Sequence, residues 1–83
     1  MKIENKNNFK TKDLYFAATL IALGYEIISL ESISPKSFQF NFNIESQKLA
    51  EFENNFWQRK LLVDARTFSD SIKEIKTRIY GQG

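Results

Sequence analysis

Seven residues in the middle of the chain, Ser37–Asn43, alternate strictly between polar and aromatic side chains. Successive side chains of a β-strand point to opposite faces, so this alternation predicts a strand with one aromatic and one polar face. The amides of Gln39 and Asn41 cannot build a core, because buried polar groups without partners are costly. The aromatic face, made of Phe38, Phe40 and Phe42, is therefore expected to pack against the rest of the protein. This orientation argues against a nucleic-acid stacking platform, in which aromatic residues face solvent.

An isoleucine- and leucine-rich segment, Tyr25–Ser32, precedes this strand, and Ser34-Pro35-Lys36 separates the two. Proline fixes a backbone angle that suits turns, so the two segments are predicted to form an antiparallel β-hairpin. If the second strand lies at the edge of the sheet, its free backbone groups would let a partner or a second copy of the chain add a further strand.

A first helix is expected to begin near Lys12 and to end before Gly24. The Thr11 hydroxyl is suited to capping its first turn, and Asp13 in that turn suits the helix dipole. Gly24 follows the last apolar residue and can adopt the left-handed conformation that often ends a helix. The apolar face of this helix comprises Leu14, Ala17, Ala18, Leu20 and Ile21.

Two further helices are predicted in the second half of the chain. One runs from about Ile44 to Arg59 with Asn43 as its cap. The other starts after the cap candidate Asp64 and ends at Gly81. Apolar residues recur at helical spacing in both. They are Leu49, Phe52 and Phe56 in the first, and Phe68, Ile72, Ile75 and Ile79 in the second.

The predicted order of elements is helix, hairpin, helix, short connector, helix. The connector Leu61–Val63 is apolar and forms either a loop or a strand of a few residues. Residues 1–8 are polar and aperiodic, so we expect a flexible N-terminal arm or a short edge strand there and a single domain over residues 9–81. The expected fold class is α+β: a small antiparallel sheet centred on the hairpin, with three helices packed on one face.

The chain has 83 residues and contains neither cysteine nor histidine. Disulfides, thiolate nucleophiles, Ser–His–Asp devices and the usual zinc ligands are therefore excluded. The three glycines are isolated, and no carboxylate pair has a spacing that implies shared chemistry. We expect a protein that is not an enzyme and uses no metal or cofactor. The N-terminus lacks the apolar segment of a secretory signal, and no stretch is long enough to span a bilayer, so a cytoplasmic location without a membrane partner is expected.

The net charge is only +2, but its distribution is uneven: +3 over residues 1–12, −4 over residues 13–58 and +3 over residues 59–83. On the last predicted helix, steps of three and four residues align a polar stripe beside the apolar face. This stripe consists of Arg66, Ser69, Lys73, Lys76 and Tyr80. Such side chains suit contacts to phosphates. The candidate nucleic-acid-binding residues are Arg59, Lys60, Arg66, Lys73, Lys76 and Tyr80.

The sequence leaves two alternatives open. The stripe is also compatible with an ordinary solvated helix face, because lysines near a helix C-terminus interact favourably with the dipole. The chain is also compatible with a protein-interaction or homodimerisation module that uses the hairpin edge and exposed aromatic residues. Trp57 is either an anchor for such a partner or, beside Phe56, a lid on the core. Of the adjacent Tyr15 and Phe16, one is expected to point outward.

Several short motifs span about residues 9–80. They begin with Thr11-Lys12-Asp13-Leu14-Tyr15, Ala17-Ala18 and Gly24, resume at Phe56-Trp57 and Leu62-Val63-Asp64-Ala65-Arg66 with Phe68, and close on Ile75-Lys76 and Ile79-Tyr80. In these motifs the chain resembles a family of small uncharacterised domains from bacterial and phage sequences. That family is a domain of unknown function. The resemblance implies a regular fold and a prokaryotic or viral origin, and it carries over no catalytic or binding residue.

Overall fold

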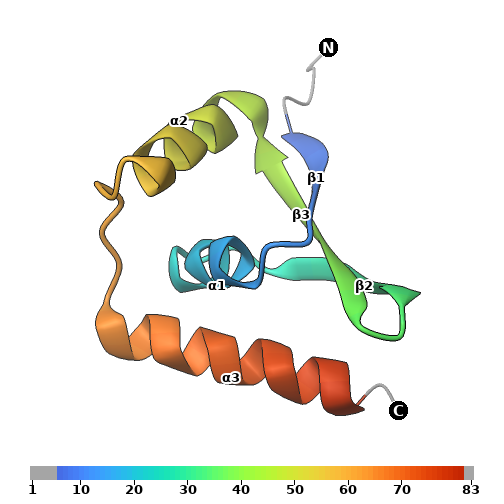
Figure 1. Cartoon of the computed structure of the whole chain (residues 1–83). Coiled ribbons are helices and arrows are strands. Elements are labelled where there is room, and N and C mark those ends of the chain that lie inside the picture. The colour runs from blue at the N-terminus through green and yellow to red at the C-terminus, as the bar shows by residue number, and fades with distance from the viewer. Residues whose placement is uncertain (1–5, 82–83) are drawn as a thin grey trace.

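A three-stranded antiparallel sheet and three helices make up the fold (Figure 1). The computed structural model describes residues 6–81. In chain order the elements are β1 (Lys6–Thr11), α1 (Leu14–Ala22), β2 (Ile27–Ser34), β3 (Ser37–Glu45), α2 (Ser46–Trp57) and α3 (Ala65–Gly81). The helices lie on one side of the sheet, with α2 and α3 spread apart on either side of α1 (Figure 1). The predicted α+β class is confirmed.

The strand order is β1-β3-β2, so the alternating segment forms the central strand. Its phenylalanines face the core as predicted: Phe40 is 2% exposed and Phe42 is fully buried. Phe42 pairs with Phe9 on β1 and with Ile27 on β2, which places three apolar side chains in one row across the inner face of the sheet. The core consists of buried apolar residues of α1, of Ile27 on β2, of Phe40, Phe42 and Ile44 on β3 and of Ile75 on α3, with Phe9 packed against it.

An edge position for β3 is wrong, because β1 and β2 flank it on both sides. Over residues 6–8 the N-terminal segment is an edge strand rather than an arm, and it pairs with Asn43–Glu45. The rest of the predicted arm, residues 1–5, lies outside the described residues. On the other side of the sheet, β2 shows register shifts at Ile28 and Ile33. Such bulges hinder the addition of a further strand.

One polar residue of β3 is buried, although it was expected to face solvent. Asn41 is only 6% exposed, because Lys10 of β1 and Ser29 of β2 lie beside it as its partners in the sheet. Its amide group donates a hydrogen bond to the Ser29 hydroxyl at 2.6 Å. The pairing of β1 along β3, which the sequence pattern left open, is what covers this side chain.

The helix α1 begins at Leu14, two residues later than expected, and its cap is Asp13. The Asp13 carboxylate accepts hydrogen bonds from the backbone N–H groups of Tyr15 at 2.9 Å and Phe16 at 3.1 Å. The predicted cap, Thr11, is the last residue of β1, and its hydroxyl accepts a bond from the Asp13 N–H at 3.1 Å. As expected for neighbours, only one aromatic side chain points outward: Tyr15 is 58% exposed and Phe16 is 4% exposed.

The end of α1 follows the prediction. Gly24 has a φ of +107°, which is the left-handed region that favours glycine. Its N–H donates to the Ile21 carbonyl at 2.9 Å, and the N–H of Tyr25 donates to the Leu20 carbonyl at 3.0 Å. These two bonds make a Schellman motif, which satisfies the last carbonyls of the helix and turns the chain toward β2.

The helix α2 begins at Ser46 rather than near Ile44, because β3 continues to Glu45. The predicted cap, Asn43, is therefore still part of the strand, and Glu45 takes the cap position without a side-chain hydrogen bond. None of the α2 residues is buried. Its apolar face is only half-buried against the core and consists of Leu49, Phe52 and Phe56. This helix is therefore the most loosely packed of the three.

The helix α3 starts from its predicted cap. The Asp64 carboxylate accepts hydrogen bonds from the Thr67 backbone N–H at 2.8 Å and from the Thr67 hydroxyl at 2.9 Å. The predicted apolar stripe packs mainly against α1, and Ile75 at its centre is fully buried. Residues 58–64, which link α2 to α3, contain no strand, so Leu61–Val63 is a loop.

The cap makes a testable prediction about pH. Its hydrogen bonds, above all the one from the Thr67 backbone, hold the pKa of Asp64 below its ordinary value of 3.8. The contribution of the carboxylate to stability is therefore present above pH 3.8 and is lost as the pH falls through the lower folded-state pKa. When the pH is lowered from about 7 to about 2, the free energy of unfolding of Asp64→Asn is expected to fall by less than that of the wild type. Urea unfolding at both pH values measures this, and equal losses would contradict it.

Candidate nucleic-acid interface

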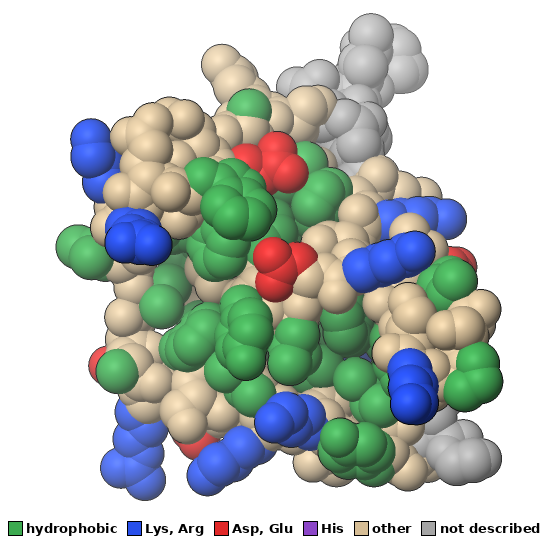
Figure 2. Space-filling view, in the orientation of Figure 1, with side chains coloured by type: hydrophobic (Ala, Val, Ile, Leu, Met, Phe, Trp, Pro, Cys, Tyr) green, Lys and Arg blue, Asp and Glu red, His purple; other side chains and the backbone are tan. Residues whose placement is uncertain are grey.

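The predicted polar stripe lies on one flank of α3, and all of its side chains are exposed. Its members are Arg66, Ser69, Lys73, Lys76 and Tyr80. An α-helix turns by about 100° per residue, so these positions fall within a sector of about 80°. The buried Ser71 and Ile75 lie outside that sector. Figure 2 shows Lys and Arg side chains in a row over α3, along the lower edge of the molecule.

The cations of this stripe are not neutralised by ion pairs. Among the described side chains, those of residues 8–81, the structure contains one ion pair, between Arg78 and Glu74 at 3.8 Å. Glu74 lies about 100° around the helix from Lys73, so this pair belongs to the other flank. Asp70 is the nearest acidic residue in angle, and it forms no ion pair in the described part of the chain. The stripe therefore keeps its positive charge available for an anionic partner.

Arg59 and Lys60 lie where α2 ends. The Arg59 N–H donates to the Phe56 carbonyl at 3.1 Å, and the Lys60 N–H donates to the Asn55 carbonyl at 2.8 Å. This is a second Schellman motif, but here arginine occupies the position that usually holds glycine. Arg59 has a φ of +62° and is the one residue other than glycine with a positive φ among residues 6–81. Both side chains are exposed.

The strained backbone of Arg59 leads to a prediction about stability. Replacing Arg59 by glycine removes the steric cost of the left-handed conformation, so Arg59→Gly is expected to raise the free energy of unfolding by about 0.5–1 kcal/mol. The melting temperature should rise by about 2–8 °C for a domain of this size. Lys60→Gly is the matched control, because it also removes one exposed cation but relieves no positive φ. A melting temperature of Arg59→Gly at or below that of the wild type would refute the interpretation.

The linker brings the two basic groups to the same side of the molecule. In Figure 1 it runs along one side, from the end of α2 to the start of α3. Figure 2 shows Lys and Arg side chains near both of its ends. Asp64 lies in the linker between them, with its carboxylate turned to the first turn of α3 by the bonds from Thr67. We call this surface the basic edge, and its residues are Arg59, Lys60, Arg66, Lys73, Lys76 and Tyr80.

The exposure of Trp57 overturns its interpretation as a lid on the core. It is the last residue of α2 and is 73% exposed. Its ring meets that of Phe56 at a centroid distance of 5.3 Å and an angle of 83°. Phe56 is the neighbour that packs inward, against Phe16 at 5.0 Å. Adjacent residues of a helix point in different directions, and the core has room for one of these two rings.

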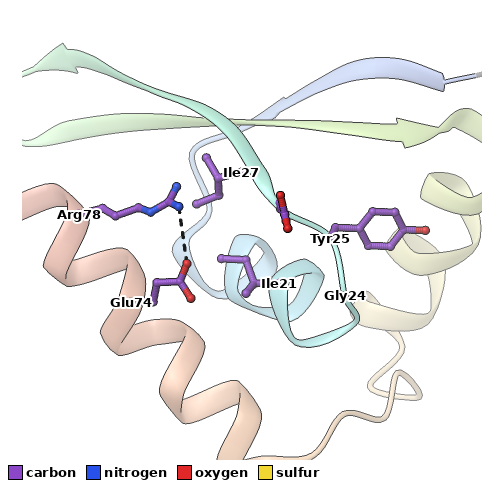
Figure 3. A pocket seen from close by; sticks show the side chains of 7 residues that line it. Ile21, Gly24, Tyr25, Ile27, Glu74 and Arg78 are labelled. Atoms are coloured by element: carbon purple, nitrogen blue, oxygen red, sulfur yellow. Dashed lines mark ion pairs between the residues drawn. The ribbon is translucent and has the colours of Figure 1, made fainter.

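A pocket of about 390 Å³ opens on the other flank of α3, where α3 faces the end of α1 and the start of β2. Figure 3 shows Glu74 and Arg78 facing each other at its wall, opposite Ile21 and Ile27. No local sequence pattern predicts this pocket, because its two halves are about 50 residues apart in the chain. Its lining also includes Glu26, so it is not a basic site and it is separate from the basic edge.

Over residues 6–81, no three histidine, cysteine, aspartate or glutamate side chains are grouped so as to hold a metal ion. No helix in this part of the chain combines the length and the apolar character needed to cross a membrane.

Neither the curated proteins nor the solved structures include a match to this chain. Among protein families, residues 6–81 match the one described as "Domain of unknown function (DUF5659)". The matched region runs from the start of β1 to the end of α3 and so includes every described helix and strand. It confirms the resemblance to a domain of unknown function that the short motifs indicate. The chain therefore belongs to the DUF5659 family.

Proposed function

We propose that this domain is a non-enzymatic module that binds nucleic acid through the basic edge. The observation that supports this most strongly is that the cations of the basic edge are exposed and take part in no ion pair among the side chains of residues 8–81. Arginine and lysine side chains in such a state suit contacts with phosphate oxygens. The absence of histidine and cysteine favours binding over catalysis. We further propose that the protein acts in the cytoplasm of a bacterium or of a phage-infected cell.

Binding by this surface should be weak, because the net charge is only +2. It should depend strongly on salt, because cations that neutralise phosphates release counterions. If three to five phosphates are neutralised, raising salt from about 50 mM to about 200 mM should weaken binding by roughly 40- to 500-fold for duplex DNA and by roughly 20- to 130-fold for a single strand. Fluorescence anisotropy of labelled single-stranded DNA, duplex DNA and RNA tests this directly. Binding that weakens steeply with salt supports the proposal, and no binding to any of the three at low salt contradicts it.

A protein partner is the second candidate, and the packing of α2 favours it. No residue of α2 is buried, and Trp57 and Leu62 are 73% and 85% exposed. Figure 2 shows hydrophobic side chains gathered on the face between α2 and α3. Addition of a strand to the hairpin is the less favoured route, since β3 is central and β2 is bulged. Light scattering at high concentration tests self-association: a mass of 9.7 kDa would contradict a homodimer.

A further inference from the structure

We propose that the basic edge selects single-stranded nucleic acid and that Trp57 stacks on an unpaired base beside it. This inference rests on the proposed function and adds the class of nucleic acid and the residue that selects it. It follows from three features of the structure: the support of the Trp57 ring, the cations that follow it in the chain, and the exposed Tyr80 ring on the flank of Lys73 and Lys76.

The Trp57 ring is exposed and also well supported. Its contact with Phe56 is the outermost of a series of edge-to-face contacts that continues from Phe56 to Phe16 at 5.0 Å and from Phe16 to Phe9 at 5.8 Å. Phe16 is 4% exposed and belongs to the core. The indole therefore rests on the half-buried Phe56, which packs against the core, while 73% of the residue remains accessible. A ring ordered in this way loses little conformational freedom when a base stacks on it.

Two positively charged residues follow Trp57 closely in the chain. Arg59 and Lys60 come two and three residues after Trp57, and the hydrogen bonds of the second Schellman motif fix their backbone against the last turn of α2. A nucleotide carries its base and its phosphate on the same sugar. A base on Trp57 would therefore place the adjoining phosphates close to these two side chains, which is the combination of stacking and charge found in single-strand binding proteins.

The remaining aromatic residues show why the strand should be single. In a duplex each base face is covered by the neighbouring base pair, so an aromatic side chain finds a free face only on an unpaired base. Phe40 and Phe42 are closed off inside the core. Tyr80 is 77% exposed and shares the flank of Lys73 and Lys76, and it supplies a second stacking position. It lies about 21 Å along α3 from Arg66, so the two stacking positions lie toward opposite ends of the basic edge.

The first measurement uses the intrinsic fluorescence of Trp57, which is the chain's only tryptophan. We expect its emission to fall when an oligothymidylate of about 12 nucleotides is added at low salt, because stacking quenches the indole. A duplex of the same length should leave the emission unchanged. Quenching by both, or by neither while anisotropy reports binding, would overturn the inference.

The second measurement compares Trp57→Leu with Trp57→Phe by anisotropy of the labelled single strand. Trp57→Leu keeps an apolar side chain but removes the π-face, and we expect it to bind about tenfold more weakly than the wild type. Trp57→Phe keeps a π-face and should retain most of the affinity. Leu62→Ala is the control for the loss of exposed apolar surface without loss of an aromatic ring. Melting temperatures verify that each variant folds, which is expected at exposed positions.

The outcomes separate the two proposals. If no nucleic acid binds at low salt, both the proposed function and this inference fail. If binding is salt-sensitive but Trp57→Leu and Trp57→Phe bind the single strand with the same affinity, binding by the basic edge is supported and stacking by Trp57 is refuted. If duplex binds as tightly as single strand, the selection of a single strand is refuted.

Discussion

Reversing the two central charges of the basic edge, by Lys73→Glu together with Lys76→Glu, is expected to reduce nucleic-acid binding by about a hundredfold or more at low salt. Both side chains are exposed on the same flank of α3. The substitution removes two phosphate contacts and replaces them with two repulsive charges. Anisotropy with the oligonucleotides described above measures the loss.

The matched control for this variant is Lys36→Glu with Lys48→Glu. These lysines are also exposed, one in the hairpin turn and one near the start of α2, and neither belongs to the basic edge. The control changes the net charge by the same amount, so it isolates the position of the charges from their number. An equal loss in both double variants would show that net charge alone drives binding and would contradict a defined site.

The largest expected effect on stability is that of Phe42→Ala. Phe42 is fully buried in the central strand, between Phe9 of β1 and Ile27 of β2. Truncating a buried phenylalanine removes its transfer free energy and leaves a cavity, at a cost of about 3–5 kcal/mol. A domain of this size has a total free energy of unfolding of roughly 4–10 kcal/mol, so this variant should lose a large fraction of its stability. Urea unfolding followed by circular dichroism measures the change.

Phe38→Ala is the comparison for this experiment, because Phe38 has the same side chain on the same face of β3 but is only half-buried. Its cost should be about 1–2 kcal/mol, in proportion to the smaller area removed from water. A similar loss in both variants would contradict a core centred on the row that contains Phe42.

The residues of the candidate site could be predicted from the sequence, but their ion pairing and backbone conformation could not. Spacing alone aligned Arg66, Lys73, Lys76 and Tyr80 on one flank, since helical geometry fixes that relation. The i, i+4 spacing of Glu74 and Arg78 permits the ion pair on the opposite flank, but spacing could not show that Asp70 forms no ion pair with the stripe in the described part of the chain. The left-handed backbone of Arg59 also had no signal in the sequence, because nothing in an arginine side chain favours it.

The local features of this protein follow from its amino-acid sequence alone. The alternation around Phe40, the glycine that ends α1 and the carboxylate that caps α3 each depend on hydrogen bonds or side-chain directions within a few residues. Local stereochemistry is enough to specify such features. The tertiary structure alone decided that β1 pairs along β3, which made β3 central and buried Asn41. It also decided that Phe56 rather than Trp57 enters the core. These outcomes depend on which distant segments compete for the same space, and the period of a sequence pattern carries no information about that competition.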